Sequence, residues 1–487
     1  MAGAPNDAQT DVDRSSSDAS SDAASHADRT IAAAVPASVR RLMARLWTGG
    51  HAAFVVGGSV RDVLLGRPAR DWDLATDARP DEILDLFPGA VYENAFGMVA
   101  VRERDEAGRT VDINEITTFR SDHDYADFRR PHRVEFGDSI EADLARRDFS
   151  VNAIAWGAAA EGARIREPAI VDPFDGRTDL ATRTLRAVGE PEVRFGEDAL
   201  RMLRAVRFAA TLEFEIEPAT LAAIRVKAPL VEHLSGERVG TELDRLLGAE
   251  SPSIGLRLTA ETGLLEHISP ELAAQRGVPQ NKVEGEDLWD HTLRTVDAAP
   301  ADRPIVRLAA LLHDIGKPET QADGHFHGHD RLGAEMAADF LGRLRYPRDS
   351  IDRVTLLVRH HMFDYRDDWS DSAVRRFIGK IRREALDELF ALREADNVGS
   401  GHPPNAYGLD ELRARVRAEL EAGVALDRAD LAIDGDDLQA ELGMERGPEI
   451  GRVLEGLLER VLADPALNDR PTLLLLARSI AEDEADR

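Results

Sequence analysis

The distribution of apolar positions divides the chain into two regions. Up to about residue 170, short apolar runs such as AAFVVGG at 52–58 alternate with polar stretches, which predicts buried strands joined to helices by tight turns. From about residue 178 onwards, apolar residues recur at intervals of three and four, as in EDALRMLRAVRFAATL at 197–212, which is typical of amphipathic helices. The pattern therefore predicts an α+β region with a small mixed sheet, followed by an all-α remainder.

Changes in this pattern also predict where the domains begin and end. Residues 1–35 are rich in Ala, Ser and Asp and hold almost no large apolar side chain, so we expect a disordered tail. The mixed α/β region then occupies residues 36–172. Three helical regions follow, at 173–275, 276–401 and 402–487.

Composition narrows the classes of protein that need to be considered. The 487 residues are 43% hydrophobic, which is enough for several cores, and the absence of cysteine excludes disulfides and thiolate metal sites. No apolar run approaches 18 residues and no secretory signal is visible, so we expect a cytoplasmic protein without a membrane partner. A net charge of −29 argues against a non-specific nucleic-acid coat protein, although it leaves room for a local arginine-lined groove.

Two carboxylates near the N-terminus suggest a site for divalent cations. Asp71 and Asp73 lie in DWDLAT, a predicted strand, where residues two apart point to the same face. Such a pair suits two Mg²⁺ ions that hold the attacking and leaving oxygens of a phosphoryl transfer. The turn GGSVRD at 57–62, between a predicted strand and a helix, lets the backbone approach a phosphate. Each feature alone is commonly structural, but their combination favours phosphoryl transfer.

These residues begin a series of motifs that resembles a known family. The order and content of six segments are similar to class II CCA-adding tRNA nucleotidyltransferases and the related bacterial poly(A) polymerases of the DNA polymerase β superfamily. The segments are GGSVRDVLLGRPARDWDLAT (57–76), ITTFRSDHDYADFRRP (116–131), DLARRDFSVNAIAW (143–156), DPFDGRTDL (172–180), GEDALRMLRAVRFAA (196–210) and SGERVGTEL (235–243).

The resemblance implies roles for individual residues of this nucleotidyltransferase head. Asp71 and Asp73 would bind magnesium, and Glu115 would be the third catalytic carboxylate, with Asp112 as the alternative because strand alternation places the two on opposite faces. The residues that would bind the nucleotide, its triphosphate or its sugar are Gly58, Arg61, Arg147, Asp148 and Asn152.

A helix in the next region carries polar residues at every third position. Asp198, Arg201, Arg204 and Arg207 are neighbours in this series, and the usual interpretation of such spacing is a surface stripe with an Asp–Arg ion pair. The resemblance implies instead that Asp198 and Arg201 hydrogen-bond the Watson–Crick edge of the incoming base, while Arg204 and Arg207 hold phosphates. Protein side chains would thus replace a nucleic-acid template.

Histidines concentrate in a third region. Seven of the 14 lie between residues 291 and 361, and the adjacent pair His313–Asp314 is followed by Gly-Lys. The order of these residues resembles the HD phosphohydrolase superfamily, whose imidazole and carboxylate ligands suit a divalent transition metal. The resemblance implies that one metal is held by His291, His313, Asp314 and Asp396, whereas His329 and His361 hold a second metal or bind phosphate.

The resemblance implies that the chain adds C, C and A to the 3′ end of tRNA from CTP and ATP and releases pyrophosphate, with an appended HD domain that is a candidate metal-dependent phosphohydrolase. Two alternatives in the same class stay open, a poly(A) polymerase and an enzyme that adds only CC or only A. An alternative of another class is an HD phosphohydrolase whose head merely binds RNA. The sequence fixes neither the oligomeric state nor the role of residues 402–487.

Overall fold

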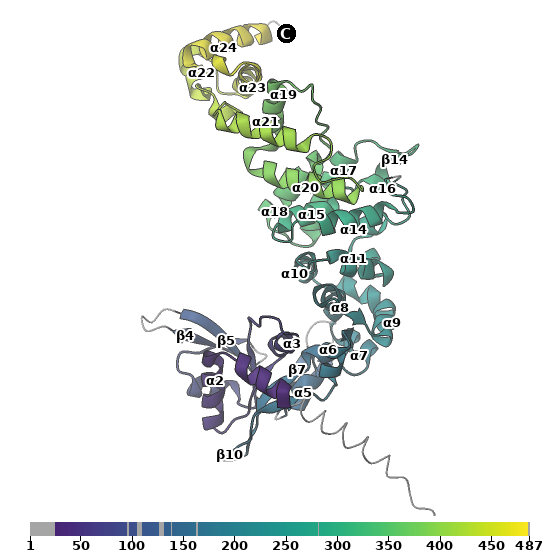
Figure 1. Ribbon diagram of the computed structural model, residues 1–487. Coiled ribbons are helices and arrows are strands. Elements are labelled where there is room, and N and C mark those ends of the chain that lie inside the picture. The colour runs from purple at the N-terminus through teal and green to yellow at the C-terminus, as the bar shows by residue number, and fades with distance from the viewer. Residues whose placement is uncertain are drawn as a thin grey trace, which may run out of the picture. The chain divides into compact units, whose positions relative to one another are not determined.

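The computed structural model describes residues 25–94, 97–104, 110–125, 131–137, 139–161, 164–280 and 282–485. The chain forms two compact units, which we describe separately (Figure 1). The first unit comprises Met1–Glu242 together with Leu258–Ile268, and the second comprises Leu243–Arg257 together with Ser269–Arg487.

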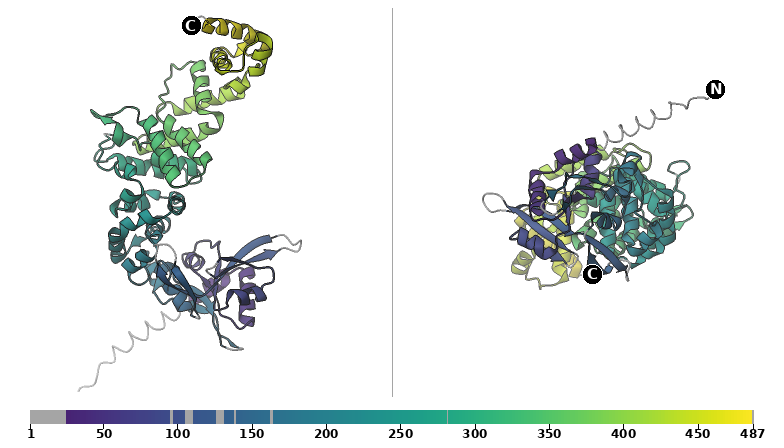
Figure 2. Two further views of the ribbon diagram at one scale, coloured as in Figure 1. Left: turned by 180° about the vertical axis from the view of Figure 1, so that it is seen from behind. Right: turned by 90° about the horizontal axis from the view of Figure 1, so that it is seen from below.

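A mixed sheet is the framework of the first unit. Within the described residues it has seven strands in the order β11-β8-β1-β2-β5-β4-β3. The central strand β1 (Ala53–Val56) pairs antiparallel with β2 (Asp73–Thr76) and with β8 (Ala155–Ala158), and β2 pairs parallel with β5 (Thr110–Thr118). The outer strands are β3 (Val91–Asn94), β4 (Met98–Arg104) and β11 (Ala169–Val171). Strands β4 and β5 form a long antiparallel pair that extends beyond the rest of the sheet in each view (Figures 1 and 2).

Short strand pairs and helices complete this unit. The pairs are β6 (Arg120–Tyr125) with β7 (Pro131–Phe136), β9 (Ala160–Glu161) with β10 (Arg164–Ile165), and β12 (Thr184–Leu185) with β13 (Glu215–Ile216). The helices beside the sheet are α2 (Ala37–Thr48), α3 (Gly58–Leu64), α4 (Pro80–Leu86), α5 (Ile140–Ala145), η1 (Ser150–Asn152) and α6 (Gly176–Ala181). The helices that follow are α7 (Pro191–Glu197), α8 (Leu200–Leu212), α9 (Pro218–Lys227), η2 (Ala228–His233), α10 (Gly236–Leu247), α11 (Pro252–Glu261), α12 (Leu264–Ile268) and α13 (Pro270–Ala273).

The core of the sheet explains why the apolar run at 52–58 becomes its centre. All four residues of β1 are buried, since strands pack against them on both sides and helices lie over the faces. Phe54 and Val56 belong to one apolar cluster with Phe119, Ile140 and Leu144. Burial of both faces is what a continuous, non-alternating apolar strand requires.

The predicted disordered tail is too long at its C-terminal end. Residues 25–34 are helical, and Ile31 and Val35 are almost completely buried. The Asp28 carboxylate also accepts a hydrogen bond from the backbone N–H of Ile170, 2.8 Å away. Two apolar side chains and one acidic side chain thus attach residues 25–35 to the rest of the unit. The Ala-rich composition of this segment did not indicate that it would be ordered. Residues 1–24 lie outside the described residues.

The second unit is built almost entirely from helices. Its first part contains α14 (Leu288–Ala298), α15 (Pro304–Leu312), α16 (Lys317–Thr320), the strands β14 (Gln321–Ala322) and β15 (His325–Phe326), α17 (His329–Arg343), α18 (Arg348–His360) and α20 (Leu386–Gly399). Between and after these lie α19 (Asp371–Ile381), η3 (Arg383–Ala385), α21 (Leu409–Glu421), η4 (Arg428–Asp430), α22 (Gly435–Leu442), α23 (Pro448–Ala463), η5 (Pro465–Leu467) and α24 (Arg470–Ala485).

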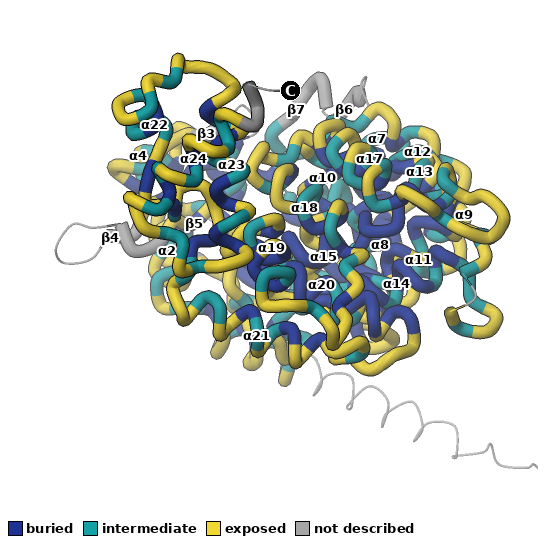
Figure 3. Tube along the Cα trace, turned by 90° about the horizontal axis from the view of Figure 1, so that it is seen from above, coloured by how far each residue is buried: buried dark blue, intermediate teal, exposed yellow. Residues whose placement is uncertain are grey.

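Helix α15 forms the centre of the second unit. Every residue from Ile305 to Leu312 is buried, and α14, α18 and α20 pack around the helix (Figure 3). Apart from Arg307, whose Nε donates to the backbone oxygen of Ala299 at 3.0 Å, these residues are apolar on every side of the helix, so other helices must enclose it. This position matters for the chemistry because His313 and Asp314 follow directly at its C-terminal end. Among the described residues, no helix combines the length and apolar character needed to cross a membrane.

Candidate active site and metal centre

A sharp turn between β1 and α3 opens the first candidate site. Gly57 has φ 77° and ψ −130°, a backbone conformation that requires glycine, and a Cβ at this position would lie 2.6 Å from Nη1 of Arg147 and displace that guanidinium. Helix α3 starts at Gly58, and Arg61 in its first turn donates to Oδ1 of Asn152 at 2.7 Å. The turn thus brings three of the residues implicated in nucleotide binding (Gly58, Arg61 and Asn152) close to Arg147.

The two aspartates of the DWD motif lie at the start of β2. The strand begins at Asp73, and Asp71 precedes it by two residues. Both aspartates are exposed, whereas Trp72 between them is buried. The parallel register pairs Leu74 with Ile116, and one step back along both strands it places Glu115 next to Asp73. Glu115 is likewise exposed. The register therefore supports Glu115 as the third carboxylate; the side chain of its alternative, Asp112, lies outside the described residues.

The charges around Asp73 show that the carboxylate pair is close enough to interact. The pKa of Asp73 is raised, chiefly because its carboxylate has lost part of its hydration and further because Asp71 carries a like charge, while Arg147 opposes both effects. A cation bound between the two aspartates would relieve their repulsion. The pair therefore has the chemistry expected of a magnesium site.

A buried ion pair connects this end of the sheet to helix α8. The Asp148 carboxylate accepts from Nε and Nη2 of Arg204 at 2.7 and 2.6 Å, and also from Nδ2 of Asn152 at 3.1 Å. Burial alone would raise the pKa of Asp148, but Arg204 and the hydrogen bond from Asn152 outweigh it and lower that pKa to about 2. Asp148 is thus ionised at neutral pH and fixes the position of Arg204.

Helix α8 carries the three predicted arginines, but Asp198 is not part of it. Asp198 has an extended backbone at the C-terminal end of α7, and its carboxylate accepts from the N–H of Leu200 at 3.1 Å. Asp198 therefore precedes α8 rather than belonging to it, because the helix is interrupted between α7 and α8, but its backbone oxygen still accepts from the N–H of Arg201 at 3.1 Å. The side chain of Arg201 donates to Glu197 Oε2 at 2.6 Å and to the backbone oxygen of Arg146 at 2.9 Å.

Sequence reasoning missed the residue that holds Asp198. Arg238, near the start of α10, donates through Nη2 to both carboxylate oxygens of Asp198 at 3.1 and 2.9 Å, while its Nη1 is buried with no hydrogen-bond partner among the described residues. Arg238 lies within SGERVGTEL, a segment to which the resemblance drew attention but for which no residue role was assigned. A local pattern cannot reveal a pair separated by 40 residues.

The arginines of α8 gather around an aromatic ring. The guanidinium carbons of Arg61, Arg204 and Arg207 lie 5.3, 5.2 and 4.0 Å from the centroid of the Phe208 ring. Arg207 is also paired with the buried Glu242 at 2.6 Å. Each of these arginines also pairs with a carboxylate, since Arg61 is 2.8 Å from Asp62 and Arg204 is 2.6 Å from Asp148. Three guanidinium groups thus share one aromatic ring while their charges are balanced.

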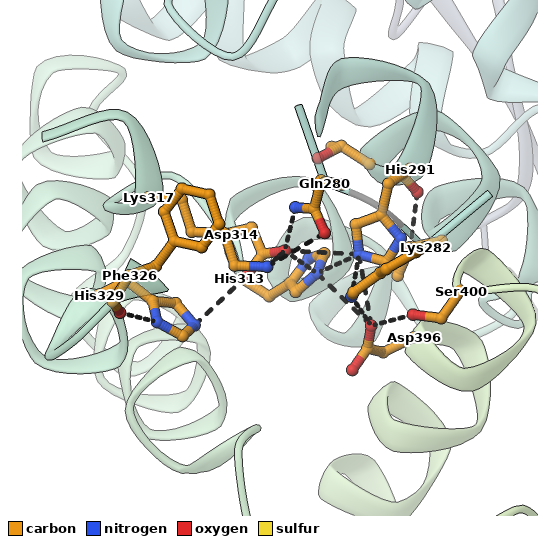
Figure 4. Close-up of polar contacts among 12 residues, drawn as sticks. Gln280, Lys282, His291, His313, Asp314, Lys317, Phe326, His329, Asp396 and Ser400 are labelled. Atoms are coloured by element: carbon orange, nitrogen blue, oxygen red, sulfur yellow. Dashed lines mark hydrogen bonds and ion pairs between the residues drawn. The ribbon is translucent and has the colours of Figure 1, made fainter. Parts of the chain in front are cut away.

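The second candidate site lies in the other unit, at the C-terminal end of α15. Nε2 of His291 is 3.1 Å from Nε2 of His313 and 3.3 Å from Oδ1 of Asp396, and Oδ2 of Asp314 is 3.1 Å from Nε2 of His313 (Figure 4). Ligands about 2 Å from one metal ion are typically about 3 Å from one another. These four side chains, all buried, thus have the spacing of a metal site.

The orientation of the imidazoles supports the same interpretation. Nδ1 of His313, His329 and His361 each hydrogen-bonds the backbone oxygen three residues earlier, at 2.8, 2.7 and 2.7 Å. This contact places the proton on Nδ1 and leaves the lone pair of Nε2 directed into the site, as in histidines that bind metals. His329, His361 and Asp314 form a second group whose donor atoms lie within 4.8 Å of one another.

The electrostatics keep the carboxylates of this site ionised. Burial would raise the pKa of Asp314, but His313 and Lys317 lower it well below its usual value, and His291 and Lys282 do the same for Asp396. Two lysines, which are scarce in this chain, therefore adjoin the predicted ligands. The sequence analysis noted Lys317 only as part of the motif after Asp314, and it gave no role to Lys282. Lys317 Nζ is 2.7 Å from Asp314, and Lys282 Nζ is 3.5 Å from Asp396.

Known proteins resemble this chain over most of its length. Family models match at residues 53–186, described as poly A polymerase head domain, at 213–276, described as a probable RNA and SrmB-binding site of polymerase A, and at 283–400, described as HD domain. A CCA-adding enzyme of Streptococcus suis is 46% identical over 444 residues, which cover 91% of this chain and 96% of the relative. The chain belongs to the CCA-adding enzyme family. The resemblance and the fold class inferred from the sequence are thereby confirmed.

Other members of the CCA-adding enzyme family add detail to this assignment. The structure of the Bacillus stearothermophilus CCA-adding enzyme in complex with CTP aligns with a TM-score of 0.67 at 28% identity and covers 92% of this chain and 98% of that one. An A-adding tRNA nucleotidyltransferase of Deinococcus radiodurans is 35% identical and covers 84% of this chain and 91% of the relative. The family thus includes enzymes that differ in the nucleotides they add.

Proposed function

We propose that the chain adds C, C and A in turn to the 3′ end of tRNA, from CTP and ATP, and releases pyrophosphate. The observation that carries this proposal is the connected set of charges from Asp73 through Arg147 and Asp148 to Arg204. It connects the carboxylates that we propose to bind cations with the helix that we propose to read the base. Activity in the cytoplasm, where CTP, ATP and tRNA are available, is part of the proposal.

The proposed chemistry requires positioning and charge neutralisation rather than a covalent intermediate. The 3′-hydroxyl of tRNA attacks the α-phosphorus of the nucleotide, the bond to the β-phosphate breaks, and pyrophosphate leaves. Asp71, Asp73 and Glu115 would hold two Mg²⁺ ions, whose positive charge offsets that of the reacting phosphate. Arg61 lies beside the Gly57 turn, where a triphosphate can accept hydrogen bonds from its guanidinium.

Base selection would be performed by Asp198 and Arg201. An aspartate acceptor and an arginine donor can together match the Watson–Crick edge of cytosine, and a small rearrangement can match adenine. Arg238 holds the Asp198 carboxylate by two hydrogen bonds, and Glu197 holds Nη1 of Arg201. We assign both contacts a positioning role, since each fixes a group that would read the base.

A conservative substitution tests the role of the carboxylates. Asp71→Asn keeps the shape of the side chain but halves the charge of the pair, so we expect incorporation of C and A to fall by about three orders of magnitude. Asp85→Asn, an exposed position on α4, makes the same chemical change in the same unit and serves as the matched control. Incorporation by Asp71→Asn equal to that of the control would show that the metal assignment is wrong.

A second candidate in the same class is an enzyme that adds only A. The similarity to the A-adding relative from Deinococcus radiodurans makes this alternative specific. A tRNA that lacks all three nucleotides of its 3′-terminal CCA distinguishes the two candidates. A CCA-adding enzyme extends this tRNA, whereas an A-adding enzyme extends only a tRNA that already ends in CC. Part of the segment at 121–131, which by resemblance favours full CCA synthesis, lies outside the described residues.

We further propose that the HD site holds a divalent transition metal and hydrolyses phosphate esters. The convergence of His291, His313, Asp314 and Asp396 supports one ion, and that of Asp314, His329 and His361 supports a second. Metal analysis of the purified chain is the test, with His313→Ala expected to lose at least half of the bound metal. Equal metal content in His313→Ala and the unaltered chain would contradict this proposal without affecting the first.

A further inference from the structure

The face of the sheet that carries the candidate catalytic carboxylates continues beyond them onto β4. The registers of β2, β5 and β4 place Asp73, Glu115 and Ala100 in one row, so these three side chains point to the same face. The next pair on this face of β4 and β5 is Arg102 with Ile113, which lie directly opposite each other. Arg102 is therefore on the same face as Glu115, one pair further along the two strands.

The residues on this part of the face are open to solvent. Ile113 is 55% exposed, and Val91 of β3, which pairs with Ala100, is 41% exposed. Arg102 is also exposed, and among the described residues its side chain takes part in no hydrogen bond or ion pair. We call Val91, Arg102 and Ile113 the outer surface. A cation beside exposed apolar side chains suits a nucleotide, which combines an anionic phosphate with the apolar faces of a base.

The order of the strands places the outer surface on the opposite side of the carboxylates from the residues implicated in nucleotide binding. Strand β1, which leads into the Gly57 turn and Arg61, pairs with one edge of β2. Strand β5 pairs with the other edge of β2, and β4 lies beyond β5. The triphosphate therefore belongs on the β1 side of Asp73, whereas the outer surface lies on the β4 side.

The geometry of phosphoryl transfer makes this arrangement informative. The attacking and leaving oxygens lie roughly in line, on opposite sides of the phosphorus atom. With pyrophosphate leaving on the β1 side, the 3′-hydroxyl of the tRNA approaches the α-phosphorus from the side of β5 and β4. The nucleotide that carries this hydroxyl then lies next to the outer surface.

We propose that Arg102 binds the phosphate nearest the 3′ end of the tRNA, with Ile113 and Val91 in contact with the terminal nucleotide. The proposal rests on the nucleotidyl transfer proposed for the carboxylates. A guanidinium donates paired hydrogen bonds to phosphate oxygens, and apolar side chains can pack against a base or a ribose. Arg102 thus contributes to the binding of tRNA and not to that of CTP or ATP.

Steady-state kinetics of the full-length chain, with CTP, Mg²⁺ and a tRNA that lacks its CCA, test this assignment. In Arg102→Ala we expect KM for tRNA to rise about fivefold or more and KM for CTP to change less than about twofold, because only the tRNA loses a contact. Arg102→Lys should recover part of the loss. Arg40→Ala, which removes an exposed positive charge from α2, should leave both constants almost unchanged. An unchanged KM for tRNA in Arg102→Ala, or an equal rise for tRNA and CTP, would overturn the proposal.

The dependence on salt identifies the contact as one with a phosphate. The slope of log KM for tRNA against log salt concentration should fall by about 0.7 in Arg102→Ala, the value for one contact to a single strand. The slope for Arg40→Ala should equal that of the unaltered chain. An equal slope in Arg102→Ala would contradict the phosphate contact. Failure of the unaltered chain to incorporate C would instead contradict the proposed function, and this proposal with it.

A matched pair of substitutions tests the apolar part of the outer surface. Ile113→Asp places a negative charge where the terminal nucleotide would lie, so KM for tRNA should rise about fivefold or more while KM for CTP stays within about twofold. Ile165→Asp makes the same change at a position of β10 that is 45% exposed, and it should leave KM for tRNA almost unchanged. Equal values of KM for tRNA in the two variants would show that the tRNA does not pass over Ile113.

Discussion

At the scale of single residues, the pair of the buried Asp148 and the partly buried Arg204 is the contact that joins the two halves of the proposed nucleotide site. The pKa of Asp148 is about 2, below its ordinary value of 3.8, so its ionised form is favoured by folding. The stabilisation is therefore complete above about pH 4 and is lost as the pH falls from there towards 2. It amounts to roughly 2 kcal/mol.

Removing the partner should change this titration in a known direction. In Arg204→Met the burial of Asp148 is no longer opposed by the arginine, so we expect its pKa to rise by at least about one unit. Carbon-13 NMR of the labelled aspartate carboxyls between pH 2.5 and 6 measures the change. Arg207→Met, on the same helix but paired with Glu242, is the control and should leave the Asp148 resonance almost unchanged. An unaltered pKa in Arg204→Met would contradict the assigned cause.

Arg238 allows a test of a positioning role. Arg238→Met leaves the Asp198 carboxylate without the two hydrogen bonds that hold it, so kcat/KM for both CTP and ATP should fall by about tenfold or more. Arg238→Lys should restore part of the loss. Arg245→Met, an exposed position on the same helix, should have little effect. A loss of thermal stability without a change in kcat/KM would assign Arg238 a purely structural role.

At the scale of elements, the sequence predicted the types of structure well and their junctions less well. The continuous apolar run predicted β1, whose residues are all buried. The recurrence of apolar residues at intervals of three and four predicted the helix α8. The break before α8 escaped prediction, since Asp198 fits a helical spacing and only its contact with Arg238 shows otherwise. Lys282 also escaped, because its proximity to Asp396 spans 114 residues.

The contact between α8 and α10 gives a prediction about stability. Glu242 is 4% exposed and pairs with Arg207, so Glu242→Gln removes the carboxylate charge that faces a largely buried cation. Such changes typically cost about 3 kcal/mol, which corresponds to a fall of roughly 5–10 °C in the unfolding temperature of the first unit. Calorimetry measures this fall. Glu237→Gln, exposed on the same helix, is the control, and equal melting of the two variants would contradict the prediction.

At the scale of the whole molecule, the two candidate sites belong to different compact units. We therefore expect their activities to be separable by mutation. Asp71→Ala should abolish nucleotide incorporation and retain metal at the HD site, whereas His313→Ala should lose metal and retain incorporation. Incorporation assays and metal analysis on the same preparations give both values. If either variant loses both properties while remaining folded, the sites are not independent.

The central claim concerns which nucleotides the enzyme adds and in what order. The most direct measurement supplies a tRNA that lacks its 3′-terminal CCA together with CTP, ATP and Mg²⁺, and then sequences the product. The account predicts that each extended tRNA ends in a single CCA, and that CTP alone yields tRNA ending in CC. Long tails of A on the product would contradict the account. It would also be contradicted if the enzyme extended a tRNA that ends in CC but did not extend the tRNA that lacks CCA.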